Sequence, residues 1–475
     1  MNTQPATAHC PTANPTQVCF DLALIQRYDR NGPRYTSYPT AVEFHPAADA
    51  RQYRLAAAFS NLRKQQPLSI YVHVPFCASP CFYCGCNKVI TRDQAKAEIY
   101  VQYLLREIAL QAPLFDHQRV VEQLHFGGGT PTFLSPEQMQ RVMAGLRQHF
   151  NLCDSDQQRE FSIEIDPRTL QAQTLAQLRQ LGFNRISLGV QDFDPEVQTA
   201  VNRVQSETET LRAIEQAREL GFRSISVDLI YGLPLQTPQR FTNTLESVIR
   251  ARPNRIAVYG YAHMPHIFKP QKQIDATQLP NPAERLQLLQ LTIEKLTAAG
   301  YVYIGMDHFA LPDDELVLAQ QAHSLHRNFQ GYSTRAECDL IGLGVSAIGK
   351  VADTYAQNAK TLKQYYAALT NGQLPIEREL VMHRDDQIRH TVIQEVMCNG
   401  ELRFDELSKA LHIDFRHYFA AELVALQRLQ ADGLITLDND VLQVTPSGRL
   451  LLRHIAMEFD VYLHKAHQQT FSKAI

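Results

Sequence analysis

The chain has 475 residues, which at roughly 150 residues per domain suggests two or three domains. An apolar fraction of 44% and a charged fraction of 20% exclude a disordered, collagen-like or coiled-coil chain. The 46 basic residues nearly balance the 49 acidic ones, so the formal charge of -3 gives no reason to expect nucleic acid or an anionic membrane as a partner. No apolar run reaches the ~18 residues of a membrane helix, and the N-terminal sequence lacks an export signal, so we expect a cytoplasmic protein without membrane contact.

Residues 1–55 are expected to form an N-terminal arm or lid. The segment is rich in Pro, Thr and Ala, shows no sustained periodicity, and contains RYDRNGPRYTSYPT at 27–40. A mobile lid could bring its polar side chains to an acidic ligand, and a solvated basic tail is the alternative. The side chains that could make such contacts are Arg30, Arg34, Tyr35 and Tyr38.

Residues 56–370 are expected to form an α/β domain. Short apolar runs alternate here with amphipathic segments, and one helix start is marked by a capping box of Ser135 and Gln138 with Pro136 between them. Repeated strand and helix units predict parallel strands with right-handed crossovers, hence an incomplete parallel β/α barrel, with a doubly wound sheet as the alternative. The predicted strands are 69–74, 122–126, 161–165, 185–190, 224–230, 255–261 and 301–306.

Residues 371–475 are expected to form a smaller, mostly α-helical domain with a wing-like hairpin. Helical patterns at 385–397, 403–411 and 417–430 precede two short strands within 435–444 and a last helix. A winged DNA-binding module is the alternative. Because the wing sequence TLDNDVLQ has two aspartates and no basic residue, it suits phosphate contacts badly, and we expect no nucleic acid partner.

Four cysteines fall within one short window, HVPFCASPCFYCGCNK, directly after the first predicted strand. Cys77, Cys81 and Cys84 have the spacing C-x3-C-x2-C. Thiolates are soft ligands that suit iron-sulfur clusters and zinc. Three ligands on a cubane would leave one iron open for a small molecule, whereas a structural zinc site would use Cys86 as a fourth ligand.

Polar and glycine residues follow the other predicted strands at their carboxyl ends. In a β/α barrel these ends meet on one face, so we expect their side chains to gather around one site. For the glycines a tight turn is the alternative, and for the polar residues it is an interior hydrogen bond. The residues are Gly127 to Thr130, Glu164, Gln191, Asp228 and Ala262.

The cysteine loop resembles that of radical S-adenosylmethionine enzymes, in which it holds a 4Fe-4S cluster. From about residue 25 to the C-terminus the chain is similar to the oxygen-independent coproporphyrinogen III oxidases within that superfamily. The resemblance implies a radical SAM barrel, one cluster and two molecules of S-adenosylmethionine. It is carried by GPRYTSYPT, CGCNK, LHFGGGTPTFL, IEIDPR, GVQDF, VNR, DLIYGLP, GMDHFA, LHRNFQGY and DLIGLGVSAI.

The resemblance also implies a role for individual residues. Cys77, Cys81 and Cys84 would ligate the cluster, and together with Tyr71 they are the residues expected to take part in catalysis. The expected contacts of the cluster-bound S-adenosylmethionine are Tyr71, Gly128, Glu164 and Ile348. The expected contacts of the second molecule are Tyr83, Gly129, Thr130, Gln191, Arg203, Asp228 and Ala262.

The activity that the resemblance implies is oxidative decarboxylation of two propionates of coproporphyrinogen III to vinyl groups. A 5'-deoxyadenosyl radical would start the reaction, and the product would be protoporphyrinogen IX, an intermediate of heme biosynthesis. A low-potential donor such as flavodoxin or ferredoxin would supply electrons to what we expect to be a monomer. A heme-binding chaperone of the same superfamily is one alternative, disfavoured by Cys86 and the GPRYTSYPT arm, and a radical methyltransferase or cyclopropanase is another.

Overall fold

The computed structural model describes residues 18–63 and 66–463. The chain forms two compact units, each assembled from separate stretches of sequence. The sheet unit comprises Val42–Arg285 and Glu337–His383, and the helical unit comprises Met1–Ala41, Leu286–Ala336 and Arg384–Ile475. The units are therefore discontinuous in sequence, whereas the domains predicted at 1–55, 56–370 and 371–475 are consecutive, and those boundaries stay a prediction.

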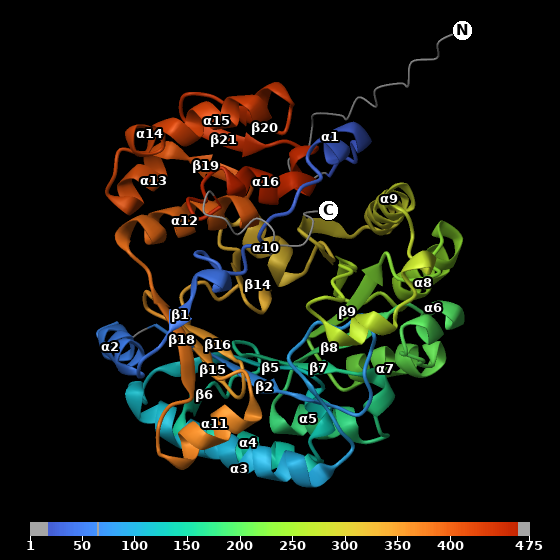
Figure 1. The fold of residues 1–475 in the computed structure, drawn as a ribbon, viewed down its shortest axis with the longest axis vertical. Coiled ribbons are helices and arrows are strands. Elements are labelled where there is room, and N and C mark those ends of the chain that lie inside the picture. The colour runs from blue at the N-terminus through green and yellow to red at the C-terminus, as the bar shows by residue number, and fades with distance from the viewer. Residues whose placement is uncertain (1–17, 64–65, 464–475) are drawn as a thin grey trace. The chain divides into compact units, whose positions relative to one another are not determined.

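Parallel strands form the centre of the sheet unit (Figure 1). Their order is β15-β2-β5-β7-β8-β9-β10, and each neighbouring pair is parallel. The first six predicted strands are confirmed, and a helix lies in every connection between them, as parallel pairing requires. The result is an open sheet of the incomplete β/α barrel type. The strands are β2 (Leu68–Val74), β5 (Val120–Gly128), β7 (Glu160–Ile165), β8 (Arg185–Gln191), β9 (Ser224–Tyr231), β10 (Arg255–Gly260) and β15 (Asp339–Leu343).

Helices cover the sheet, and α3, α4 and α11 pack along one side of it (Figure 1). The predicted capping box of α4 is confirmed, because Gln138 N donates to Ser135 Oγ over 3.2 Å and Ser135 N donates to Gln138 Oε1 over 3.0 Å. The α-helices of this unit are α2 (Arg51–Ser60), α3 (Gln94–Gln111), α4 (Pro136–His149), α5 (Thr174–Leu181), α6 (Pro195–Ala200), α7 (Glu207–Glu219), α8 (Pro238–Ala251) and α11 (Leu362–Thr370). The 3-10 helices are η1 (Ala41–Glu43), η2 (Ala112–Leu114), η3 (Pro131–Phe133), η4 (Pro167–Thr169), η5 (Lys269–Gln273) and η6 (Ala276–Gln278).

An antiparallel extension beyond β15 was not predicted. There β16, β17, β18 and β1 follow one another in antiparallel pairs. β15 is buried along its length, so its residues show no alternation of buried and exposed positions. Among β15 to β18, an α-helix, α11, lies only between β17 and β18, so the strand-helix alternation that marked the parallel strands is missing here. The additional strands are β1 (His45–Pro46), β3 (Phe76–Cys77), β4 (Val89–Ile90), β6 (Asn151–Leu152), β16 (Ile348–Val351), β17 (Thr354–Asn358) and β18 (Ile376–Val381).

The run predicted at 301–306 as a further parallel strand forms β11 (Val302–Gly305) instead, in the helical unit. It pairs antiparallel with β12 (His308–Ala310). The reason is a tight turn, in which Met306 takes a φ of 53° and returns the chain before a crossover helix could form.

The helical unit contains the predicted C-terminal helices and hairpin. The hairpin, β20 (Ile435–Leu437) and β21 (Val441–Val444), gains a third strand, β19 (Glu401–Arg403), which pairs antiparallel with β21. The helices are α1 (Leu22–Arg27), α9 (Pro282–Ala298, which begins at the end of the sheet unit), α10 (Glu315–Gln321), α12 (Arg384–Cys398), α13 (Phe404–Leu411), α14 (Phe415–Tyr418), α15 (Ala420–Ala431), η7 (Gly448–Leu451) and α16 (Leu452–Met457). A second hairpin consists of β13 (His326–Asn328) and β14 (Gly331–Ser333).

The described part of the N-terminal arm, up to Ala41, contributes to the core of the helical unit. Tyr35 is 1% exposed and Tyr38 is 0% exposed, and both belong to the apolar cluster around α12 and α16. Tyr35 donates a 2.9 Å hydrogen bond to Asp460, and Arg453 Nε donates to the Pro33 carbonyl over 2.7 Å. These two tyrosines are therefore core residues here and not free ligand contacts of a lid.

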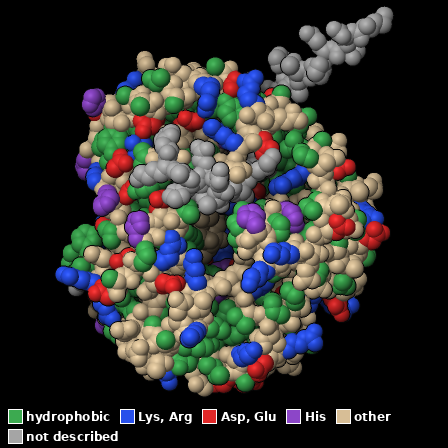
Figure 2. All heavy atoms as spheres, in the orientation of Figure 1, with side chains coloured by type: hydrophobic (Ala, Val, Ile, Leu, Met, Phe, Trp, Pro, Cys, Tyr) green, Lys and Arg blue, Asp and Glu red, His purple; other side chains and the backbone are tan. Residues whose placement is uncertain are grey.

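Two surface features bear on partners. Basic and acidic side chains are interspersed over the face shown in Figure 2, as the near-balanced charge predicts. Residues 18–63 and 66–463 include no helix with both the length and the hydropathy needed to cross a bilayer.

Candidate active site

The cysteine loop follows β2 directly and is fixed at its base. Phe76 and Cys77 pair as β3 with β4, which holds the two ends of the loop together. Inside the loop, Cys84 N donates to the Cys81 carbonyl over 3.3 Å, and Lys88 Nζ donates to the Cys84 carbonyl over 3.0 Å. The three predicted ligand cysteines therefore lie on one loop, Cys77 in β3 at its base and Cys81 and Cys84 in a hydrogen-bonded turn.

A cavity of about 410 Å³ opens at the carboxyl ends of the parallel strands. Barrel geometry brings these ends to one face, which is where the sequence predicted the site. The predicted site residues that line this cavity are Cys77, Cys81, Tyr83, Cys84, Gly128, Gly129, Thr130, Glu164, Gln191, Arg203 and Asp228. Four others, Tyr71, Gly127, Ala262 and Ile348, do not line it.

Tyr71 lies behind the cavity wall, on β2. Its ring stacks on His125 with centroids 5.8 Å apart and an interplanar angle of 14°. His125 Nε2 in turn lies 3.2 Å from Glu164 Oε1, and the Tyr71 hydroxyl lies 3.0 Å from His73 Nδ1. Tyr71 thus packs on His125, and His125 in turn contacts Glu164, which lines the cavity.

Ala262 and Ile348 lie on neighbouring segments. The Ala262 carbonyl accepts a 3.2 Å hydrogen bond from Gln271 Nε2, which also donates to the Tyr83 carbonyl over 2.9 Å. That amide ties the segment after β10 to the cysteine loop. Ile348 begins β16 and pairs with Gln357 of β17.

The glycine turn after β5 packs against the cysteine loop. Gly129 N donates to the Val74 carbonyl and Thr130 N to the Phe76 carbonyl, each over 2.8 Å. An ideal Cβ on Gly129 would lie 2.8 Å from the Phe76 carbonyl oxygen, and Gly128 has a φ of 111°. Glycine is therefore required at these positions by contact with the chain itself, in addition to any ligand.

Two carboxyl groups in the cavity have opposite pKa shifts. Burial favours the neutral form of Glu164, but hydrogen bonds from His125 and from the Gly128 amide (3.2 Å each) outweigh it and hold its pKa below the ordinary value. Burial raises the pKa of Asp228 to about 7, and the negative charge of Glu164 adds to this effect. Ser187 donates to Asp228 over 3.0 Å. Below about pH 7 the cavity therefore holds one ionised carboxylate, Glu164, and one carboxyl that is mostly neutral, Asp228.

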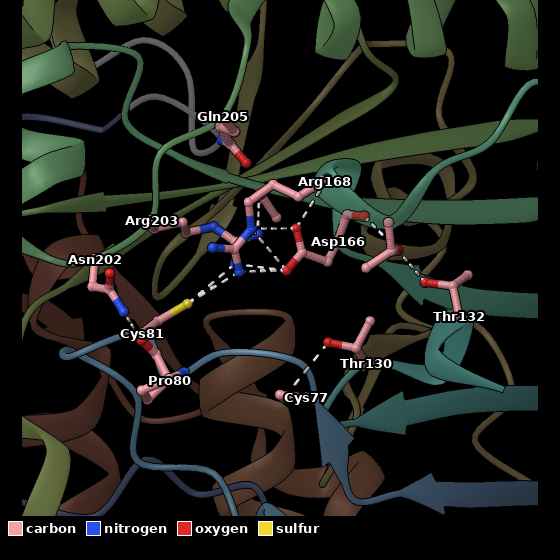
Figure 3. A network of polar contacts seen from close by, with 12 residues as sticks. Cys77, Pro80, Cys81, Thr130, Thr132, Asp166, Arg168, Asn202, Arg203 and Gln205 are labelled. Atoms are coloured by element: carbon pink, nitrogen blue, oxygen red, sulfur yellow. Dashed lines mark hydrogen bonds and ion pairs between the residues drawn. The ribbon is translucent and has the colours of Figure 1, made fainter. Parts of the chain in front are cut away.

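The cavity also contains a cationic network (Figure 3). Arg203 was a predicted site residue, whereas its partners Asp166 and Arg168 were not. Asp166 lies between two guanidinium groups, 2.6 Å from Arg168 Nη2 and 3.2 Å from Arg203 Nη1. Both arginines also donate to the sulfur of Cys81, over 3.5 Å and 3.4 Å respectively. Asp166 directly follows β7, so its place at the carboxyl end of a strand was the available signal.

The thiols differ in their ionisation. Hydrogen bonding from the Cys86 thiol lowers the pKa of Cys84 to about 5, against the effect of burial, while the same contact raises the pKa of Cys86. Burial raises the pKa of Cys77 to about 11, although Thr130 donates to its sulfur over 3.5 Å. Cys86 therefore acts here as a hydrogen-bond donor to a predicted ligand.

These residues fit the expected 4Fe-4S cluster. The thiols of Cys77, Cys81 and Cys84 line one cavity. A cubane suits that arrangement, because each cysteine binds a different iron. Arg203 Nε is buried and has no hydrogen-bond partner within the described chain, which leaves a donor for a bound anion.

Comparison with known proteins gives the family. A profile of the radical SAM superfamily matches residues 71–248, and a profile of the HemN C-terminal domain matches residues 382–451. The oxygen-independent coproporphyrinogen III oxidase of Pseudomonas aeruginosa is 53% identical over 456 residues, covering 96% of this chain and 99% of that protein. The enzyme of the same name from Escherichia coli is 49% identical over 460 residues, covering 97% and 99% respectively.

A solved structure agrees with these sequences. The coproporphyrinogen III oxidase (HemN) of Escherichia coli, described as a radical SAM enzyme, superposes with a TM-score of 0.89 at 47% identity, over 94% of this chain and 100% of that one. Together with the cysteine loop and the open β/α sheet, this places the chain in the family of oxygen-independent coproporphyrinogen III oxidases, within the radical S-adenosylmethionine superfamily.

Proposed function

We propose that this chain converts coproporphyrinogen III to protoporphyrinogen IX in heme biosynthesis, without oxygen. Each of two propionate side chains loses a hydrogen atom, CO₂ and one electron and becomes a vinyl group. The observation that carries the proposal is that Cys77, Cys81 and Cys84, all on the loop after β2, line one cavity at the carboxyl ends of the parallel strands.

Membership of the superfamily implies a 4Fe-4S cluster and S-adenosylmethionine, which together supply a 5'-deoxyadenosyl radical. The three thiols would hold the cluster. Glu164, ionised through its hydrogen bonds, would accept from an ammonium group or ribose hydroxyls of the ligand, and the Arg203 guanidinium would donate to a carboxylate. A ligand that filled the cavity would exclude water from the reactive site.

A second S-adenosylmethionine is part of the proposal. Its residues would be Tyr83, Gly129, Thr130, Gln191, Arg203, Asp228 and Ala262. Six of these seven line the cavity, and Ala262 is joined to Tyr83 through Gln271. This supports the view that the seven residues form one binding site for the second molecule. Equilibrium dialysis of the reconstituted protein should give two bound molecules per chain, and Asp228→Asn should weaken one of the two binding events.

The test of the proposed function is anaerobic reconstitution followed by product analysis. Wild-type protein should form a vinyl porphyrinogen, and Cys81→Ser should lose product formation by at least about 10³-fold, because a hydroxyl is a poor ligand for iron at this cluster. Cys153→Ser is the matched control. Cys153 is also buried but lies outside the cysteine loop, so its loss should leave the product yield within a few-fold.

Two outcomes would reject the proposal. Equal product from wild type and Cys81→Ser would exclude the cluster from the reaction, and stable heme binding without vinyl product would favour the heme-binding chaperone. The electron donor is proposed to be a low-potential carrier such as flavodoxin or ferredoxin, and the working form to be a cytoplasmic monomer.

A further inference from the structure

The three cysteine sulfurs have unequal electrostatic surroundings. Cys77 accepts from a neutral hydroxyl, that of Thr130, over 3.5 Å. Cys81 accepts from two guanidinium groups, Arg203 Nη1 over 3.4 Å and Arg168 Nη2 over 3.5 Å. Cys84 lies beside one cation, the Lys88 ammonium. The pair of guanidinium groups therefore distinguishes Cys81 from the other two cysteines (Figure 3).

Asp166 fixes the two guanidinium groups in place. Its carboxylate accepts from Arg168 Nε over 3.0 Å and from Arg168 Nη2 over 2.6 Å, the bidentate geometry that holds an arginine most rigidly. The same carboxylate lies 3.2 Å from Arg203 Nη1. Two positive charges and one negative charge leave a net positive charge beside Cys81.

Burial makes this charge effective. The exposed fractions of the side chains are 22% for Arg168, 8% for Arg203 and 10% for Asp166, so water screens their charges less than it would at the surface. Hydrogen bonds and positive charge at a ligand sulfur stabilise a cluster more when it carries an additional electron.

We propose that Arg168 is a positioning residue of the cluster site: clamped by Asp166, it donates to the Cys81 sulfur and raises the reduction potential of the bound cluster. This inference deepens the proposed function and rests on its cluster. Arg203 shares the contact, but its Nη2 also donates to the Gly189 carbonyl over 2.6 Å, and it is a proposed S-adenosylmethionine ligand. Arg168 is therefore the residue whose effect on the cluster can be measured separately.

The experiment is a potentiometric titration of the reconstituted protein without S-adenosylmethionine, followed by EPR of the reduced cluster. In the titration a redox mediator supplies one electron and the cluster gains it. Arg168, Arg203 and Asp166 keep their protonation states. For Arg168→Met we expect the ratio of reduced to oxidised cluster at a fixed potential to fall about tenfold, which is about 59 mV for a one-electron couple. Arg168→Lys keeps the charge, so its ratio of reduced to oxidised cluster should fall about threefold or less.

Asp166→Asn should shift the reduction potential of the cluster in the opposite direction. Removing the negative charge leaves the two guanidinium groups uncompensated, so the ratio of reduced to oxidised cluster should rise. A variant that merely disturbed the loop would not raise it. Arg179→Met is the matched control: Arg179 is 25% exposed and pairs with Asp156 over 2.9 Å, but makes no contact with the cysteine loop. Its ratio should not change.

The outcomes separate this inference from the proposed function. Wild-type protein that contains no iron and sulfide after reconstitution would overturn both. If wild-type protein takes up the cluster and Arg168→Met has the same reduction potential as wild type, the role of Arg168 alone is overturned. The same follows if Arg179→Met shifts the reduction potential as much as Arg168→Met does. A lower ratio of reduced to oxidised cluster in Asp166→Asn than in wild type would also overturn the role of Arg168. If Arg168→Met takes up no cluster, the Arg168→Lys and Asp166→Asn titrations decide the question, since they must differ in sign.

Discussion

Two carboxyl groups of the same cavity differ because of what surrounds each of them. Both Glu164 and Asp228 face the cavity from parallel strands, and burial favours the neutral form of each. Glu164 has two donors, His125 and a backbone amide, whereas Asp228 has the hydroxyl of Ser187 and the repulsion of Glu164. The residue types were readable from the sequence, but the direction of each pKa shift depends on neighbours from other strands.

A pH prediction follows for Asp228. Its pKa of about 7 in the folded state exceeds the ordinary 3.8, so between these values folded protein holds a proton that unfolded protein has released. The stability from this group is therefore lost as pH rises through about 7. Between pH 5 and pH 8 the free energy of unfolding of the apoprotein should fall by about 2 kcal/mol less in Asp228→Asn than in wild type, as measured by urea denaturation.

Ser187→Ala is the companion variant. It removes the hydrogen bond that favours ionised Asp228, so it should make the decline with pH steeper. Identical slopes in wild type, Asp228→Asn and Ser187→Ala would contradict the raised pKa.

Among the elements, the turn after β5 shows how the site is assembled. The sequence predicted a strand followed by a ligand-binding glycine turn, with an ordinary tight turn as the alternative. The structure adds a separate requirement: Gly128 needs its positive φ and has the ring of His73 beside it, while Gly129 packs on the cysteine loop. Contacts between segments so far apart in sequence leave no local pattern, which is why only the glycine content was informative.

Substitution of Gly128 should therefore cost more than backbone strain alone. An ideal Cβ at Gly128 would lie 2.5 Å from a His73 ring carbon, whereas one at Gly221, with a φ of 77°, would meet nothing within 4 Å. Gly221→Ala should lower the free energy of unfolding by about 1 kcal/mol and Gly128→Ala by about 3 kcal/mol, from strain plus overpacking. Urea denaturation of the apoproteins measures both changes in the free energy of unfolding. Equal losses in the two variants would show that the His73 ring moves aside at no energetic cost.

On the scale of the whole molecule, the two units are built from interleaved stretches of the chain. The described arm up to Ala41 and the segment Leu286–Ala336 join the C-terminal helices in one unit, while Glu337–His383 returns to the sheet. Composition and periodicity change along the sequence only where local structure changes, so they predict consecutive segments. Which segments pack together is decided by apolar side chains such as Tyr35 and Tyr38, whose partners lie more than 300 residues away.

The arm should therefore contribute to the stability of the helical unit. Tyr35→Phe removes a buried 2.9 Å hydrogen bond to the Asp460 carboxylate and should lower the free energy of unfolding of that unit by about 2 kcal/mol. Hydrogen exchange should become faster in α12 and α16 and stay unchanged in β5. Unchanged exchange throughout would contradict the assignment of Tyr35 to this core.

What the sequence determined by itself was whatever depends on local spacing: the parallel strands and their helices, the capping box of α4, the cysteine loop and the residues at the strand ends. Tertiary structure alone decided the antiparallel extension beyond β15 and the antiparallel pairing of the segment 301–306. It also decided the burial of Tyr35 and Tyr38 and the network of Asp166, Arg168 and Arg203 at Cys81. The physical reason is that hydrogen-bond periodicity and ligand spacing are properties of neighbouring residues. Burial, charge pairing and pKa shifts depend on groups that only folding brings together.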